Sequence, residues 1–168
     1  PAHLIPERSA AAHELLTWAG QDVAMSTSDR SAIAWLHRRA GFGLAPGELD
    51  RLEKLGVDAV LNRLVDPNRH GVAPVRDPWQ GLRLSYTGAS NPNYRNEAYA
   101  AIGAWLDHLA TTGRPTESWL TWFWHNHFAT ALGKVRFAGL MVAQLRLFQR
   151  AGSGSFPALL RGVTVAPA

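Results

Sequence analysis

The stretch TESWLTWFWHNHFATA, residues 116–131, predicts a helix with aromatic side chains around most of its circumference. A helix that is apolar on all sides is normally buried between other elements. We therefore expect this helix at the centre of the fold. Four of its residues form the expected structural motif, namely Trp122, Trp124, Asn126 and Phe128.

Amphipathic patterns predict further helices on both sides of this stretch. Ala98, Ile102, Trp105 and Leu109 recur at offsets of three and four, which is typical of one helical face. Ser28 is a suitable N-cap and Gly41 a suitable stop for another helix. In chain order, the predicted helices cover residues 7–18, 28–40, 46–55, 57–65, 98–109, 116–131, 134–150 and 156–163.

The stretch 66–93 interrupts this helical pattern. It is rich in Pro, Gly, Asn and Arg and has little periodicity, apart from a possible extended segment at 82–86. We therefore predict a mainly α fold, a multi-helix globular bundle with one long irregular loop and no substantial sheet. Residues 1–28 are expected to form an N-terminal extension with a short helix, and residues 29–168 a helical domain.

Composition excludes several classes of protein. The chain has 168 residues, 46% of them hydrophobic, which suits one folded domain. A net charge of +4 is a modest excess, so nucleic-acid binding is not expected. The sequence contains no run of about 18 apolar residues, so no membrane span is predicted. The sequence has no cysteine, which excludes disulfides and cysteine-ligated zinc.

Two histidines in the aromatic stretch could carry chemistry. His125 and His127 lie two residues apart, roughly 200° around a helix, so they cannot hold one metal from the same face. We predict no metal site, and the sequence does not indicate a cofactor. The favoured interpretation is that both histidines fix helix packing through hydrogen bonds. The alternative is a catalytic or metal-binding role for either histidine, with Glu117, two turns before His125, as a further catalytic candidate.

A second candidate site follows the helix expected at 28–40. Arg38 and Arg39 precede Gly41 and Gly43, and the two arginines could bind an anion. Arginines at the end of a helix are also favoured by its dipole, and the glycines permit a sharp turn. Both interpretations are open.

Taken together, residues 36–43 (LHRRAGFG), residues 123–128 (FWHNHF) and residues 151–160 resemble the N-terminal part of the domain of unknown function 1800 (DUF1800) family. The resemblance runs from about Asp29 to the C-terminus. It implies a bacterial protein, exported or in the cell envelope, but supplies no catalytic residues. Members of the family continue well beyond the equivalent of Ala168, and this chain has Ala166 where the pattern has an acidic residue. We therefore expect a fragment or a short member.

Three functions follow as hypotheses. The favoured one is a structural or interaction module that docks on a partner protein or on the missing C-terminal region. The second is part of an envelope enzyme that uses His125 or His127. The third is a carbohydrate-binding protein with exposed tryptophans, which requires Trp79 and Tyr86 to be exposed together.

Overall fold

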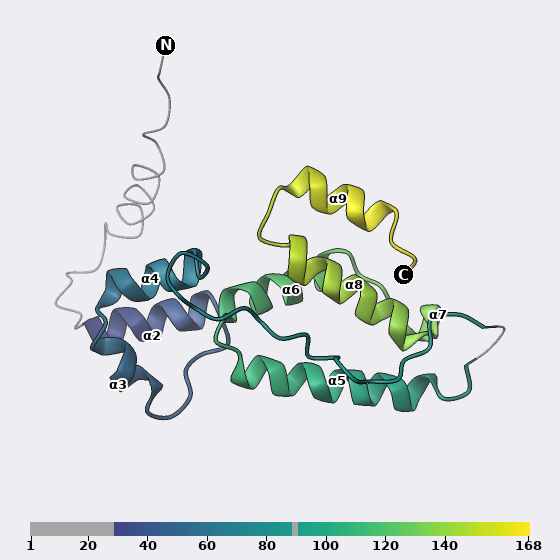
Figure 1. Ribbon diagram of the computed structural model, residues 1–168, viewed down its shortest axis with the longest axis horizontal. Coiled ribbons are helices and arrows are strands. Elements are labelled where there is room, and N and C mark those ends of the chain that lie inside the picture. Colours follow the sequence, from purple (N-terminus) through teal and green to yellow (C-terminus); the bar gives the residue numbers. More distant parts are fainter. Residues whose placement is uncertain (1–28, 89–90) are drawn as a thin grey trace, which may run out of the picture.

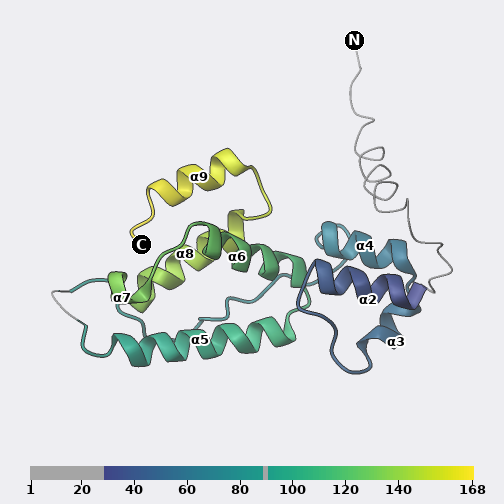
Figure 2. The same cartoon turned by 180° about the vertical axis from the view of Figure 1, so that it is seen from behind.

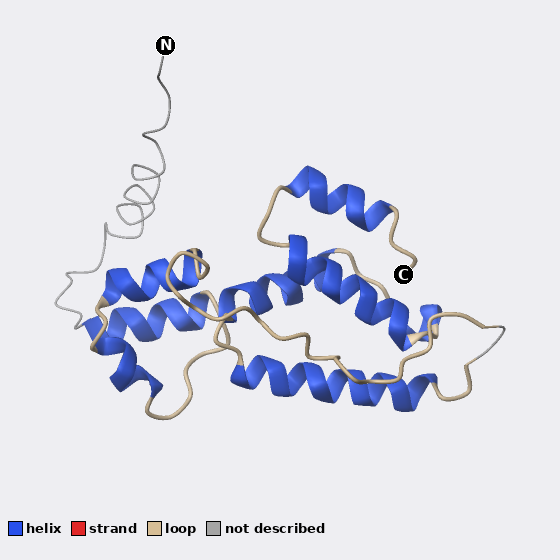
Figure 3. Ribbon diagram, in the orientation of Figure 1, coloured by secondary structure: helices blue, strands red, loops and turns tan. Residues whose placement is uncertain are grey.

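The computed structural model describes residues 29–88 and 91–168, and within these residues the chain forms eight helices and no strand (Figure 3). The predicted mainly α fold is confirmed. The predicted helix at 7–18 and the predicted N-cap Ser28 lie outside the described residues. The helices are α2 (Asp29–Arg39), α3 (Glu48–Glu53), α4 (Val57–Val65), α5 (Tyr94–Thr111), α6 (Pro115–His127), α7 (Leu132–Val135), α8 (Ala138–Ala151) and α9 (Phe156–Thr164).

Helices α2, α3 and α4 form a cluster at one end of the molecule (Figure 1). Its core consists of Ile33, Val60 and Leu64, which are buried against partly buried leucines of α2 and α3. On the surface, Arg30 of α2 pairs with Asp50 and Glu53 of α3, with N–O distances of 2.7 and 2.8 Å. Such exposed pairs contribute little, so burial of the apolar core holds the cluster together.

The central helix of the larger part of the molecule is α8, which packs against α5, α6, α7 and α9 (Figures 1 and 2). The prediction that the aromatic helix is central and buried is wrong in this respect, since α6 leaves Trp122 and Phe123 exposed. The apolar stripe of α8 accounts for its position: Ala138, Val142 and Phe148 are all buried. Within residues 29–88 and 91–168, none of the helices combines the length and the hydropathy that a membrane span requires.

The long irregular loop runs beside α5 and is fixed to it (Figures 1 and 2). Trp79 stacks on Trp105 with ring centroids 5.2 Å apart, and its indole N–H donates to the Ala101 carbonyl at 3.0 Å. Further along, Glu97 of α5 accepts two hydrogen bonds from Ser85, both at 2.8 Å. The segment 82–86 therefore takes its shape from helix contacts, and it forms no strand.

Several predicted helix boundaries differ from the structure, including those of α5, which spans Tyr94–Thr111 where 98–109 was predicted. The helix expected at 116–131 ends at His127, and the one expected at 134–150 is divided into α7 and α8. The division falls at Arg136, whose φ of 58° is left-handed and cannot continue a helix. At the start of α3, Pro46 and Gly47 both precede the helix, because Gly47 has a φ of 77°.

Candidate functional site

Helix α6 has two aromatic faces with different surroundings. One face carries Trp124, His125 and Phe128, which are partly buried. The other carries Trp119, Trp122, Phe123, Asn126 and His127 at offsets of three and four, and all of these except the partly buried Trp119 are exposed. We call this second set the outer face of α6. The residue pattern showed an aromatic helix but not this division, because both faces contain tryptophan and phenylalanine.

Trp124 fixes the inner face of α6 to the end of α8. Its indole N–H donates to the Gly152 carbonyl at 2.7 Å, and its ring stacks on Phe128 and Phe156, each with centroids 5.8 Å apart. A Cβ at Gly152 would lie 2.7 Å from Cδ1 of Trp124, so the glycine is required for this approach. Phe128 continues the contact by stacking on Phe148 at 6.0 Å.

The structure does not bring the two candidate histidines together. His125 is half-buried, its Nδ1 is buried without a hydrogen-bond partner, and burial lowers the pKa of its imidazole. His127 is exposed on the outer face and stacks on Phe123 with centroids 6.0 Å apart. Across residues 29–88 and 91–168, no group of three or more His, Asp or Glu side chains is placed to hold a metal ion.

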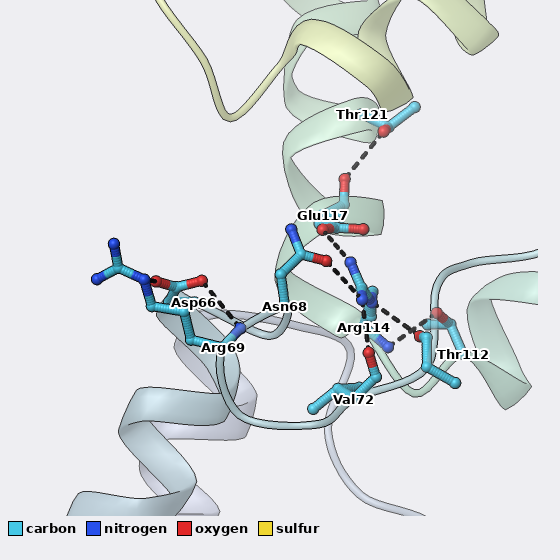
Figure 4. A network of polar contacts seen from close by, with 9 residues as sticks. Asp66, Asn68, Arg69, Val72, Thr112, Arg114, Glu117 and Thr121 are labelled. Carbon is cyan, nitrogen blue, oxygen red and sulfur yellow. Dashed lines mark hydrogen bonds and ion pairs between the residues drawn. The ribbon is translucent and has the colours of Figure 1, made fainter.

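Glu117 lies in a separate polar network around Arg114 (Figure 4). The Arg114 guanidinium, only 6% exposed, donates to the Glu117 carboxylate at 3.0 Å, to Asn68 Oδ1 at 2.9 Å and to the Ala73 carbonyl at 2.8 Å. Another hydrogen bond reaches the Val72 carbonyl. Arg114 thus joins the start of α6 to the long loop, and Glu117 serves as its charged partner.

The two candidate anion-binding arginines are exposed at the end of α2. Arg39 lies over the ring of Trp35, with its guanidinium carbon 5.7 Å from the ring centroid. Helix α2 ends at Arg39, so Gly41 follows the helix as predicted, but its φ is not positive and it does not form the left-handed cap typical of a glycine at this position. Gly41 is instead buried against Pro115, whereas Gly43 has a φ of 96° and makes the turn.

A pocket of about 190 Å³ lies behind this turn. It is formed where the end of α2 and the start of α3 meet the end of α5 and the start of α6. Residues around it include His37, Phe42, Glu48, Leu109, Thr112 and Pro115. His37 is buried and its Nε2 has no hydrogen-bond partner. The sequence did not predict the pocket, because it is formed by segments about 70 positions apart.

His108 and Ser118 form a pair that sequence reasoning also missed. The His108 Nε2 and the Ser118 Oγ lie 2.9 Å apart, and the imidazole stacks on Trp105 at 5.1 Å. Burial lowers the pKa of His108. Ser118 is completely buried, so its hydroxyl is closed to a substrate, and the pair serves to join α5 to α6.

The carbohydrate-binding hypothesis depended on exposure of Trp79 and Tyr86 together, and that expectation is wrong for Trp79. Its side chain is only 1% exposed, beneath α5, whereas Tyr86 is 42% exposed. Trp79 lies in a loop, but stacking on Trp105 and a hydrogen bond to α5 make it part of the core.

A second exposed apolar surface lies on α5. Tyr99, Ile102 and Leu106 follow one another at offsets of three and four and are 70%, 50% and 55% exposed. The opposite side of the same helix buries Ala98, Ala101 and Trp105. Helix α5 is therefore apolar on two sides, of which only one is covered within the described chain. We call Tyr99, Ile102 and Leu106 the outer stripe of α5.

Comparison with known proteins gives one result. The sequence model of a family described as "Protein of unknown function (DUF1800)" matches residues 35–168. No curated protein and no solved structure matches the chain. The match includes α6 and the pocket around His37.

Proposed function

The chain belongs to the DUF1800 family, whose description assigns no activity, and we propose that it works as an interaction module that docks on a partner protein through α5 and α6. The observation that carries the proposal is the outer face of α6, where Trp122 and Phe123 are 44% and 42% exposed. Leaving two adjacent large aromatic side chains in water forgoes the free energy that their burial would give.

The composition of this outer face suits protein recognition. Trp119 stacks on Phe123 with centroids 5.9 Å apart, and Phe123 stacks on His127, so three rings form a row along the helix. Asn126 is held at its edge by a hydrogen bond to the Trp122 carbonyl at 3.0 Å. Rigid aromatic rings with polar groups beside them are typical of the residues that dominate binding energy in protein interfaces.

The outer stripe of α5 supports the same proposal independently. An ordinary surface helix covers its single apolar face and exposes polar residues. The stripe Tyr99–Ile102–Leu106 has the spacing that a partner helix or groove would bury. The partner we expect is therefore a protein with a complementary apolar surface, either another chain or a further region of a longer one.

The enzyme alternative has less support. It is favoured by one observation, the buried and unpartnered Nδ1 of His125. Against it, His125 and His127 lie on different faces of α6, and Glu117 is bound to Arg114. Elemental analysis of the purified chain beside His125→Ala and His127→Ala variants tests this alternative. Stoichiometric metal that either variant loses would favour the enzyme.

Photocrosslinking in the native host tests the docking proposal. A benzoylphenylalanine at position 122 or 102 should give one defined crosslinked protein, whereas the same group at the exposed position 69 should not. Adding Phe123→Asp should abolish the product formed from position 122. A product of twice the chain's mass would identify a second copy as the partner. Equal crosslinking from positions 69 and 122 would contradict the proposal, and so would the absence of any crosslink, either to another chain or within a longer one.

The cellular setting is proposed from the family resemblance alone. It implies a bacterial protein of the cell envelope. Fractionation of the host, with immunodetection of the full-length protein in cytoplasmic, periplasmic and membrane fractions, tests this part of the proposal. Recovery in the cytoplasm alone would overturn it.

A further inference from the structure

Helix α5 lies along the lower edge of the molecule in both views, and no other described helix crosses its lower side (Figures 1 and 2). The outer stripe of α5, formed by Tyr99, Ile102 and Leu106, is 50–70% exposed, so the described chain does not cover it. The residues beside the stripe show what kind of partner suits it. Two of their features, a glycine and a pair of charges, are considered in turn.

The glycine is Gly103, in the middle of α5. It lies four residues after Tyr99 and three before Leu106, so it is on the same side of the helix as the stripe. A glycine in a helix is less stable than an alanine there. Nothing within residues 29–88 and 91–168 requires it, because its φ is not positive and an added Cβ would meet no atom within 4 Å. Its lack of a side chain instead leaves a gap in which a large side chain of another helix can pack.

The charges are those of Arg95 and Asp107, which are exposed near the two ends of α5. Within the described residues, neither side chain belongs to an ion pair. Arg95 is in the first turn and Asp107 directly precedes the last turn. The helix dipole favours the reverse arrangement, with anions at the start of a helix and cations at its end. The two charges are therefore placed unfavourably for α5 alone.

An antiparallel copy of α5 would make both positions favourable. Arg95 of one copy would lie near the C-terminal end of the other helix, and Asp107 near its N-terminal end. The charge pattern of α5 is thus complementary to itself when the second helix runs in the opposite direction. A parallel copy would instead place like charges beside each other.

The stripe fits the same arrangement. With a two-fold axis between Ile102 and Gly103, each Ile102 lies level with Gly103 of the second copy, where the gap is. Each Tyr99 lies level with Leu106 of the second copy, so the apolar side chains cover one another. A self-complementary contact of this kind is what a two-fold dimer requires.

We propose that two copies of the chain associate through antiparallel α5 helices, with Arg95 of each copy paired to Asp107 of the other. The two residues differ by about 4.5 Å along the helix axis in this register, a distance that a long arginine side chain spans. This inference rests on the proposed function, because it names the partner of the outer stripe of α5. The outer face of α6 takes no part in it.

The size of the contact predicts a weak dimer. An 18-residue helix is about 27 Å long and about 10 Å wide, so the contact covers roughly 300 Å² of each copy. A standard protein interface takes about 800 Å² from each partner. We therefore expect a dissociation constant on the order of 100 µM. The chain is then mainly a monomer at 10 µM and mainly a dimer at 1 mM.

Sedimentation equilibrium between 10 µM and 1 mM tests the association and its charge pairs. Asp107→Lys or Arg95→Glu alone should weaken the dimer by about fivefold, because each places like charges together twice in the dimer. The two substitutions in one chain should restore association. Residues 95 and 107 are about 18 Å apart along one helix, so this rescue requires a second copy. A wild-type chain that stays monomeric to 1 mM, or a double variant without rescue, would overturn the proposal.

Disulfide trapping tests the antiparallel direction. The chain has no cysteine, so single cysteines can be introduced at the exposed positions 96 and 110. The two positions lie nearly level across the antiparallel pair. An equimolar mixture of Asn96→Cys and Ala110→Cys should therefore give mainly the mixed disulfide on oxidation, as measured by mass spectrometry. Disulfides mainly between like variants would show a parallel pair, and a statistical mixture would show random collision; either result would overturn the proposal.

Gly103→Gln tests the close approach at the axis. Glutamine is a better helix former than glycine, so the variant should fold, which urea denaturation at 10 µM checks. Its long side chain should weaken dimerisation by at least about tenfold. Ala158→Gln adds the same side chain on α9, on the other side of α8 from α5 (Figure 1), and should leave dimerisation unchanged. Similar effects of the two variants would overturn the proposed axis.

The benzoylphenylalanine at position 102 separates failure of this inference from failure of the proposed function. A crosslinked product of twice the chain's mass supports the dimer. A product with a different protein, or a crosslink within the same chain, would overturn the dimer but leave α5 as a docking surface. No crosslink at all from position 102 would contradict both.

Discussion

A Cβ atom at Gly41 would lie 2.6 Å from the Cβ of Pro115, closer than two such carbons approach. The backbone after α2 therefore passes directly over the first residue of α6. This contact joins the α2–α4 cluster to the larger helical part and closes one side of the His37 pocket.

Gly41→Ala should consequently lower the free energy of unfolding by about 1–3 kcal/mol, as an overpacked interior does. Gly103→Ala is the matched control. Its added Cβ meets nothing within 4 Å, and Ala is favoured over Gly in the middle of α5. Chemical denaturation should show a loss for the first variant and a small gain for the second. Equal stabilities would mean that the Gly41–Pro115 contact is loose.

Trp124→Phe should destabilise the fold by about 1–3 kcal/mol, because it leaves the buried Gly152 carbonyl without its donor. Trp122→Phe, on the outer face of α6, should change the free energy of unfolding by less than about 0.5 kcal/mol. The measurement is the denaturation midpoint of each variant. If the Trp122 variant proved the less stable, our division of α6 into two faces would be wrong.

Arg114→Met should cost about 3–5 kcal/mol, because it breaks a buried ion pair and leaves the loop carbonyls and Glu117 without a donor. The control Arg69→Met removes an exposed pair with Asp66 and should cost at most about 1 kcal/mol. Limited proteolysis adds a local readout: cleavage within residues 68–76 should increase in the Arg114 variant only. An uncleaved loop would show that other contacts hold it.

Stability should fall as the solution is acidified below about pH 6.5. Burial lowers the pKa of His37, His108 and His125 in the folded state, so the unfolded chain takes up protons first as the pH decreases. The contribution of the neutral imidazoles is complete above the unfolded pKa and decreases through this window. Urea denaturation between pH 5 and 8 measures the slope, which His125→Phe should reduce. A slope unchanged by that variant would argue against a buried His125.

Local sequence pattern was sufficient for several helices. The helices predicted at 28–40 and 57–65 correspond closely to α2 and α4. The position of the central helix could not be predicted, because both α6 and α8 are rich in large apolar residues. Only the packing shows that Val142 and Phe148 are buried while Trp122 is exposed.

The site was harder to predict than the fold for a related reason. Histidines within an aromatic run suggested a catalytic site, yet the structure does not bring His125 and His127 together with Glu117. His37 and Thr112 both line the pocket but lie far apart in the sequence, with the long loop between them, so no local sequence pattern links them. Likewise, Trp79 lies in a loop without periodicity, and its burial depends on Trp105 in another element.

The long loop is held in place by residues that come much later in the chain, and this affects the order of folding on the ribosome. The partner of Asn68 is Arg114, 46 positions later, and Asp77 pairs with Arg146, 69 positions later. During synthesis, residues 66–88 therefore leave the exit tunnel long before the side chains that hold them. The α2–α4 cluster, whose contacts are local, can form meanwhile. The loop is thus expected to be the last part of the described chain to reach its native conformation, and the nascent protein is most exposed to proteases there.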